Sequence, residues 1–287
     1  KIEKGLLRLL HSWVPDQDSF LELKGQLNNS AFDLHSRGTP LANAAAGSLK
    51  LQLDELELAA LLQPWAPGLK GTLSTALELS FSLGESAIEL TQKGEIKLQK
   101  LGYKQEDSLL ELGSLHWKGA TTLALSQKGV RRIDSEGTLA LDAAKLTQQA
   151  LTVSSETLSW KGRNELAFSD GVPSKLQSNG LLSLGPLQLS QNQLELHNEG
   201  LSWQGENQVT LLNGAPASID SKGTLTLGPL LLTQNQLELR NESLSWQGDN
   251  RVTFSNGAPE SIDSKGTLGL QTVKLQQPSL QLNSETI

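Results

Sequence analysis

The 287-residue sequence contains no cysteine and no methionine. Without cysteine the chain can form neither disulfides nor thiolate metal ligands, which excludes a disulfide framework and thiol chemistry. Without an initiator methionine, it is expected to be a segment of a longer protein. The sequence also has no run of 18 consecutive apolar residues, so no segment is expected to cross a bilayer as a helix.

Charge of either sign is scarce and basic residues are in the minority. Lys and Arg number 24 against 31 Asp and Glu, which gives a net charge of -7. An acidic chain with dispersed cations has no electrostatic footprint for nucleic acid and no basic patch for an anionic membrane surface. Hydrophobic residues are 37% and charged residues 19%. The remaining Ser, Gln, Asn, Thr and Gly are typical of half-buried strands with uncharged polar outer faces.

The dominant feature is a repeat of 43 residues. Three kinds of residue return at this spacing: a glycine, a tryptophan and an isoleucine or leucine. Residues 181–223 and 224–266 are identical at 32 of 43 positions. The recurring positions are Gly94, Gly137, Gly180, Gly223, Gly266, Trp117, Trp160, Trp203, Trp246, Ile133, Leu176, Ile219 and Ile262. Such self-similarity indicates a repeat architecture. Four units are predicted, at 95–137, 138–180, 181–223 and 224–266, with a truncated fifth at 267–287.

Within a unit the apolar residues alternate with polar ones. Pairs such as Leu225/Leu227 and Leu244/Trp246 skip one residue, which places each pair on one face of a strand. Turn signals stand between them, at Gly228-Pro229 and at Asn256-Gly257. A unit is therefore predicted to form four to six short strands and no helix. With four strands about 4.8 Å apart, the tryptophans would form one row with neighbours roughly 19 Å apart.

Residues 1–94 are predicted to form a divergent β-repeat region. Glycines that precede strands recur there at Gly25, Gly47, Gly71 and Gly94, spaced 22 to 24 residues apart. Two segments have leucines spaced for short helices, at about residues 3–12 and 54–64.

The segment "LDELELAALLQPWAPGLKGTLSTALELSF", residues 53–81, resembles the AsmA-like proteins of the Gram-negative envelope. The later "GTLTLGPLLL" and "LSWQG" units are similar to the strand repeats of that family. The resemblance implies a periplasmic body, anchored to the inner membrane by a helix outside this segment. It also implies a long, curved antiparallel β-sheet groove (a β-taco) with an apolar interior. The implied function is the transfer of phospholipid between components of the inner and outer membranes.

The sequence carries no recognisable catalytic or metal-binding pattern. The four histidines, His11, His35, His116 and His197, do not recur at 43 residues and have no ligand spacing. "IDSKG" at Ile219 and Ile262 is interpreted as a solvated turn rather than a calcium site. No nucleophile motif, phosphate loop or dinucleotide fingerprint occurs. The sequence is therefore expected to have no enzymatic activity, no metal and no cofactor.

The sequence leaves two main functions open, with a folding scaffold for outer-membrane assembly as a third. The first is a lipid conduit, because exact repetition of one apolar unit offers an acyl chain many equal positions. Its candidate lipid-binding residues are Ile96, Leu98, Leu139, Leu141, Leu182, Leu184, Leu225, Leu227, Leu268, Leu270, Trp117, Trp160, Trp203 and Trp246. The second is a structural β-solenoid or adhesin-like stalk, in which the same residues fill a sealed core. Short Gly-Pro and Asn-Gly turns favour antiparallel hairpins over the solenoid.

Overall fold

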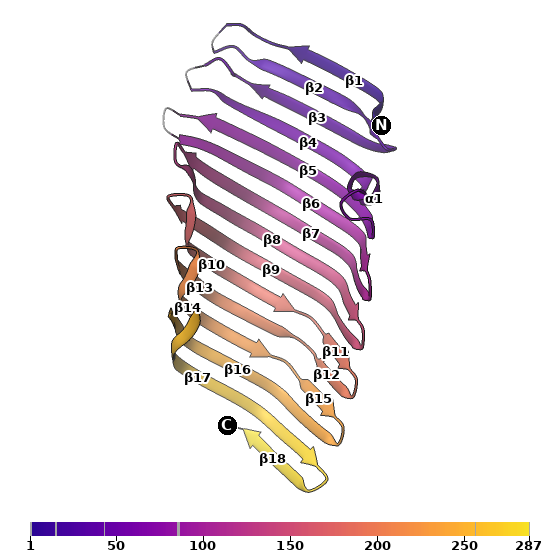
Figure 1. The fold of residues 1–287 in the computed structure, drawn as a ribbon, viewed down its shortest axis with the longest axis vertical. Coiled ribbons are helices and arrows are strands. Elements are labelled where there is room, and N and C mark those ends of the chain that lie inside the picture. Colours follow the sequence, from indigo (N-terminus) through magenta and orange to yellow (C-terminus); the bar gives the residue numbers. More distant parts are fainter. Residues whose placement is uncertain (1, 15, 43, 85–86, 256, 287) are drawn as a thin grey trace.

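The computed structural model describes residues 2–14, 16–42, 44–84, 87–255 and 257–286. Eighteen strands form one sheet, and every pairing between them is antiparallel (Figure 1). The prediction of an all-β fold is confirmed. The parallel coils of a β-helix are excluded for the described part of the chain.

The N-terminal part begins the sheet. Its elements are β1 (Ile2–Leu10), β2 (Ser19–Leu27), β3 (Ser30–Gly38), β4 (Ala46–Glu57), α1 (Leu58–Leu62) and β5 (Leu69–Leu83). Each strand pairs with the next, so this part and the 43-residue units share one continuous sheet.

The repeat part consists of longer strands. Its elements are β6 (Ala87–Gln105), β7 (Ser108–Ser126), β8 (Gly129–Gln148), β9 (Leu151–Ser169), β10 (Val172–Leu184), β11 (Leu187–Gln191), β12 (Leu194–Asn198), β13 (Leu201–Leu212), β14 (Ala215–Leu227), β15 (Leu230–Gln234), β16 (Leu237–Ser255), β17 (Ala258–Gln277) and β18 (Leu280–Thr286). Three of the long strands are interrupted once. β10 and β11 both pair with β9, while β14 and β15 both pair with β16.

The prediction of four to six short strands fits unit 181–223, which spans parts of β10 to β14, but not the units with uninterrupted strands. Each unit makes two passes of the chain across the sheet. At Gly228-Pro229 the chain continues in the same direction from β14 into β15. Proline lacks the N–H that the ladder needs, so it interrupts pairing without reversing the chain. Reversal occurs at two-residue turns such as Asn213-Gly214, whose φ angles are 53° and 81°. Positive φ at both central residues is the type I′ geometry that suits a β-hairpin.

The prediction of two N-terminal helices also differs from the structure. Residues 3–12 were expected to be helical, but β1 occupies Ile2–Leu10 and pairs with β2. A short apolar run fits either element, and here sheet pairing satisfies its backbone. Within 54–64, only Leu58–Leu62 is helical, and the preceding residues belong to β4. Leu56, which exposes 1% of its surface, and Leu58 are buried where β4 runs into α1. No helix in the described ranges is long and apolar enough to cross a membrane.

A kink recurs where each unit's first strand crosses the sheet. Lys100, Ala143 and Thr272 have positive φ there, and prolines take the equivalent places at 186 and 229. Asn198, which is 2% exposed, donates from Nδ2 to the carbonyl oxygens of Gly228 (3.1 Å) and Pro229 (3.2 Å). Asn241 donates likewise to the Gln271 carbonyl at 2.9 Å. These amides satisfy carbonyl groups at the interrupted ladder, which would be costly if buried without a partner.

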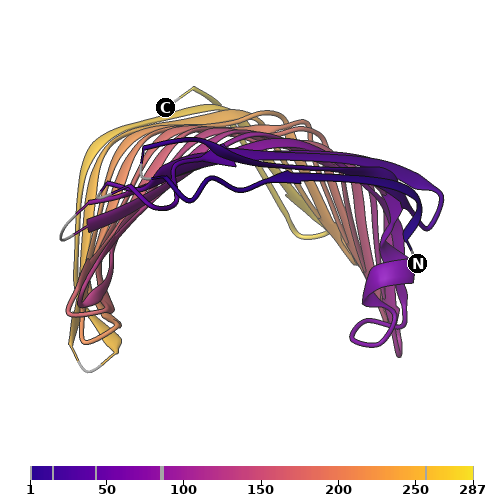
Figure 2. The ribbon, with the colours of Figure 1, turned by 90° about the horizontal axis from the view of Figure 1, so that it is seen from above.

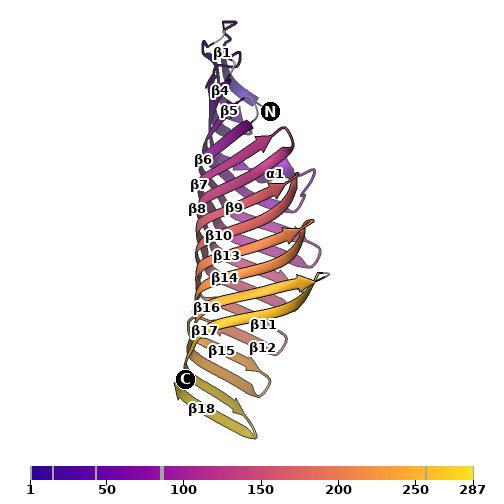
Figure 3. The same cartoon turned by 90° about the vertical axis from the view of Figure 1, so that its left-hand side faces the viewer.

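A row of nine glycines crosses the repeat part in register. It consists of Gly94, Gly119, Gly137, Gly162, Gly180, Gly205, Gly223, Gly248 and Gly266. A Cβ at Gly205 would overlap the Lys222 carbonyl oxygen and lie 2.8 Å from the Gly223 Cα and 2.9 Å from Trp203 Cζ2. The strands approach too closely here for any other residue. Viewed along its length, the sheet curves into an arch because each strand is bent (Figure 2). The edge strands β1 and β18 lie at opposite ends of its long axis (Figure 3).

Replacing a glycine of this row should destabilise the fold through crowding alone. Gly205→Ala is expected to lower the free energy of unfolding by about 1–3 kcal/mol, as overpacking does. Gly102→Ala is the matched control, because its Cβ would lie 4.0 Å from the nearest atom, in the Lys70 side chain. That change should leave stability unaltered or raise it by up to about 1 kcal/mol. Denaturant unfolding measures both variants, and equal effects would contradict a special role for the row.

Candidate functional site: the apolar face

The four repeated tryptophans lie in one cross-strand row and alternate with aliphatic residues. In order, the row is Ile96, Trp117, Leu139, Trp160, Leu182, Trp203, Leu225, Trp246 and Leu268. Residues directly opposite in antiparallel strands point to the same side of the sheet. The tryptophan row is therefore a continuous line of side chains on one face, hereafter the apolar face.

A second row lies two residues further along each strand. It contains only leucines: Leu98, Leu115, Leu141, Leu158, Leu184, Leu201, Leu227, Leu244 and Leu270. The fourteen predicted lining residues all fall in these two rows. Leu115, Leu158, Leu201 and Leu244 were missed, although a leucine two residues before each tryptophan was visible in the sequence.

The predicted spacing of the tryptophans requires correction. A spacing of 19 Å assumed four strands per unit, whereas successive tryptophans are separated by two strand spacings, or about 10 Å. The row therefore holds about twice as many tryptophans per unit length of the sheet as expected. A third row on this face, four residues beyond the glycines, is also aliphatic and includes Leu166, Leu176, Val209 and Ile219.

Each indole of the last three units lies over a pair of facing glycines. Trp203 Cζ2 lies 2.9 Å from the Cβ position of both Gly205 and Gly223, and Trp246 is placed in the same way over Gly248 and Gly266. The rings thus occupy space that the missing Cβ atoms leave. All four tryptophans of the row are half-buried, and Trp203 Nε1 is buried without a hydrogen-bond partner in the described chain.

The opposite face, hereafter the polar face, carries most of the charges. Residues adjacent to the glycine row point there by strand alternation. Charged and amide side chains from six strands line a furrow of about 700 Å³, among them Arg163, Glu206, Asp220, Lys222, Asp249 and Arg251. Arg251 contacts Asp220 at 3.5 Å and Lys222 contacts Asp249 at 3.7 Å. Exposed pairs of this kind contribute little stability, so their main effect is to keep this face hydrated.

The "IDSKG" segment was interpreted as a turn, but it lies inside β14, with Asp220 on the polar face. The turn interpretation is wrong because the glycine that ends the segment belongs to the in-register row. No cluster of three or more metal-ligating side chains occurs among the described residues.

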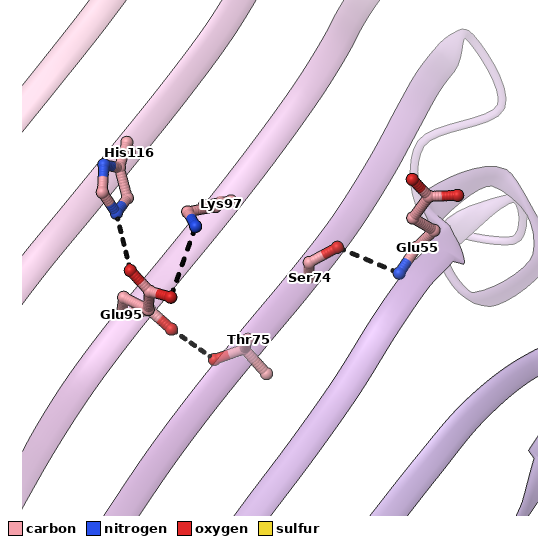
Figure 4. Close-up of polar contacts among 6 residues, drawn as sticks. All are labelled: Glu55, Ser74, Thr75, Glu95, Lys97 and His116. Carbon is pink, nitrogen blue, oxygen red and sulfur yellow. Dashed lines mark hydrogen bonds and ion pairs between the residues drawn. The ribbon is translucent and has the colours of Figure 1, made fainter.

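A small charged cluster on the polar face joins β6 and β7 (Figure 4). Glu95 accepts from His116 Nε2 at 3.2 Å and from Lys97 Nζ at 3.3 Å. The hydrogen bond from His116, followed by that from Lys97, holds the pKa of the Glu95 carboxyl below its ordinary value. From the neighbouring strand β5, Thr75 Oγ1 donates to the backbone carbonyl oxygen of Glu95 at 2.8 Å.

His116→Ala should raise the titration midpoint of Glu95 toward that of an ordinary glutamate, because the strongest donor to its carboxylate is lost. The folded pKa of Glu95 lies below the unfolded one. The stability that Glu95 contributes is therefore fully present above its unfolded pKa and is lost as the pH falls through its folded pKa. Carboxyl chemical shifts measured by NMR across acidic pH would report the midpoint. Lys104→Ala, at an exposed position further along β6, is the control. An unchanged midpoint in His116→Ala would contradict the assignment.

The chain was compared with protein family models, with curated proteins and with solved structures, and none of the three comparisons finds a match.

Proposed function

We propose that this chain binds phospholipid acyl chains on its apolar face and conducts them along the sheet between the inner and outer membranes. One observation carries the proposal: two adjacent rows of nine apolar side chains run without interruption from β6 to β17. The resemblance to AsmA-like proteins supports the same function. It also supports a periplasmic location and an anchoring helix outside this segment.

The uniformity of the rows supports movement rather than tight capture. Removing a methylene from water is worth about 0.8 kcal/mol, so a fully covered 16-carbon chain gains on the order of 12 kcal/mol. A ligand held that firmly at one place would not leave. Because the same leucine and tryptophan contacts return about every 10 Å, a chain that slides by one unit exchanges one set of contacts for an equal set. The free energy along the path then stays nearly level.

The curvature of the sheet supports a groove with the apolar face inside. Added Cβ atoms on that face would collide with the facing strand at Gly162, Gly180, Gly205 and Gly223. These collisions show how closely neighbouring strands pair along the glycine row. The ribbon curves into an arch (Figure 2). We infer that the tryptophan and leucine rows face its inner side, because an apolar surface is more easily shielded from water there than on the outside. The charged rows of the polar face would then form its hydrated outer wall.

Leu225→Asp tests the conduit against a sealed structural core. Leu225 lies between Trp203 and Trp246 in the tryptophan row. In an open groove the carboxylate still reaches water, so Tm should fall by only a few degrees, at about 2–4 °C per kcal/mol lost. Bound phospholipid should fall by more than about tenfold, because an unpaired charge in the acyl path costs several kcal/mol. Native mass spectrometry and thermal unfolding measure the two effects.

Thr224→Asp is the matched control for Leu225→Asp. Thr224 is the preceding residue of the same strand and points to the polar face, so its substitution should change neither lipid content nor Tm. A wild-type protein that holds no lipid, together with a collapsed Tm in Leu225→Asp, would favour a stalk with a filled core and overturn the conduit.

Acyl chains brominated near their middle should quench the fluorescence of the row tryptophans. The Trp13→Phe/Trp65→Phe double variant suits this measurement, because these two tryptophans are 81% and 79% exposed and lie outside the row. Bromine quenches only at close contact, so emission from the remaining four should fall with brominated phospholipid and stay constant with the unbrominated lipid. Equal emission with the two lipids would place the ligand away from the apolar face.

A further inference from the structure

A line of hydrogen-bonding side chains crosses the apolar face beside the glycine row. It lies two residues from the glycines, on the side away from the tryptophans, and its register is continuous across the units. Three pairs make up its regular part: Asn164 with Ser178, Asn207 with Ser221, and Asn250 with Ser264. These six residues are called the amide row here.

The serines fix the orientation of the amides. Ser178 Oγ donates to Asn164 Oδ1 at 2.8 Å, Ser221 Oγ to Asn207 Oδ1 at 2.7 Å, and Ser264 Oγ to Asn250 Oδ1 at 2.6 Å. With each Oδ1 engaged, the Nδ2 group of the same amide is left as a donor. None of the three Nδ2 groups has a partner or is buried within the described chain. Further along the same row, Gln92 Nε2 is buried without a partner among the described residues.

The surroundings of the amide row define what it can bind. One flank is the aliphatic row that contains Val209 and Ile219, and the other is the glycine row with the indoles over it. Cations such as Arg163 and Lys222 border the same furrow as parts of the row, but they occupy adjacent positions that alternate to the polar face. The donors of the row itself are uncharged, so its chemistry does not match a phosphate group. Free N–H donors between apolar flanks match an uncharged acceptor that is itself attached to hydrocarbon.

We propose that the amide row binds the ester carbonyl oxygens of acyl lipids. This inference rests on the proposed function and adds the substrate class: ester-linked lipids in preference to ether-linked ones. An ester carbonyl that leaves water without a hydrogen bond loses free energy, and an Asn Nδ2–H group restores that bond inside the groove. The donors recur about every 10 Å, as the tryptophans do. A lipid that slides by one unit therefore finds the same donor again, while its charged head group stays outside the row.

Two phosphatidylcholines with identical chains and head groups test the inference, one with ester linkages and one with ether linkages, both below their micelle concentrations. The ether lipid lacks the carbonyl oxygens. Isothermal titration calorimetry with the unmodified chain should give about fivefold tighter binding of the ester lipid, the effect of one neutral hydrogen bond. The triple variant Asn164→Leu/Asn207→Leu/Asn250→Leu keeps side-chain size and should bind both lipids equally.

Gln208→Leu is the control variant. Gln208 follows Asn207, points to the opposite face by strand alternation and accepts a hydrogen bond from Gln177 Nε2 at 3.3 Å, so this variant should keep the ester preference. Equal binding of the two lipids by the unmodified chain overturns the inference and leaves the proposed function standing. This comparison uses only the unmodified chain, so it does not depend on whether a variant folds. An ester preference that survives in the triple variant overturns it as well. Failure to bind either lipid overturns the proposed function and the inference together.

Discussion

The close pairing of glycine with glycine across the sheet is the constraint on which the other features depend. Along the glycine row the facing strands approach so closely that a Cβ would overlap the carbonyl oxygen of the neighbouring strand. Once the glycines are in register, the residues two and four positions away are in register too. The tryptophan row, the leucine row and the amide row therefore all follow from one alignment. A slip of one residue would move every one of these side chains to the opposite face.

The two faces of the single sheet have different roles, one apolar and one hydrated. Few side chains of the described chain are fully buried, so stability comes from long ladders of backbone hydrogen bonds and from half-buried rows rather than from a central core. The tryptophans contribute twice to this arrangement, since each ring packs against aliphatic neighbours and fills the space over two glycines. On the other face, dispersed ion pairs keep a broad exposed surface hydrated. The proposed lipid path fits this division. Within the described part of the chain, the apolar face has no second protein layer packed against it, whereas the polar face is covered by water.

Much of this could be predicted from the sequence. The 43-residue period, the all-β class and the common row of the four tryptophans follow from spacing and alternation. The number of strands could not be read in the same way, because Gly228-Pro229 and Asn213-Gly214 are both turn signals. Only the second has the positive φ angles that reverse a chain. The apolar N-terminal segment satisfies helix and strand patterns equally, and pairing with β2 decides between them. The amide row went unrecognised because isolated asparagines and serines carry no meaning until register lines them up.

A unit of two strands returns the chain to its starting edge and its starting direction. Duplication or deletion of one whole unit therefore leaves every row continuous, with its faces, kinks and turns unchanged. Insertion or deletion of half a unit, one pass of the chain, would reverse the chain direction. It would also pair positions of one strand with positions of the next that do not match them. The match of residues 181–223 and 224–266 at 32 of 43 positions is what duplication of one unit would leave behind. Each added or deleted unit therefore changes the length of the sheet by about 10 Å and leaves its faces unchanged.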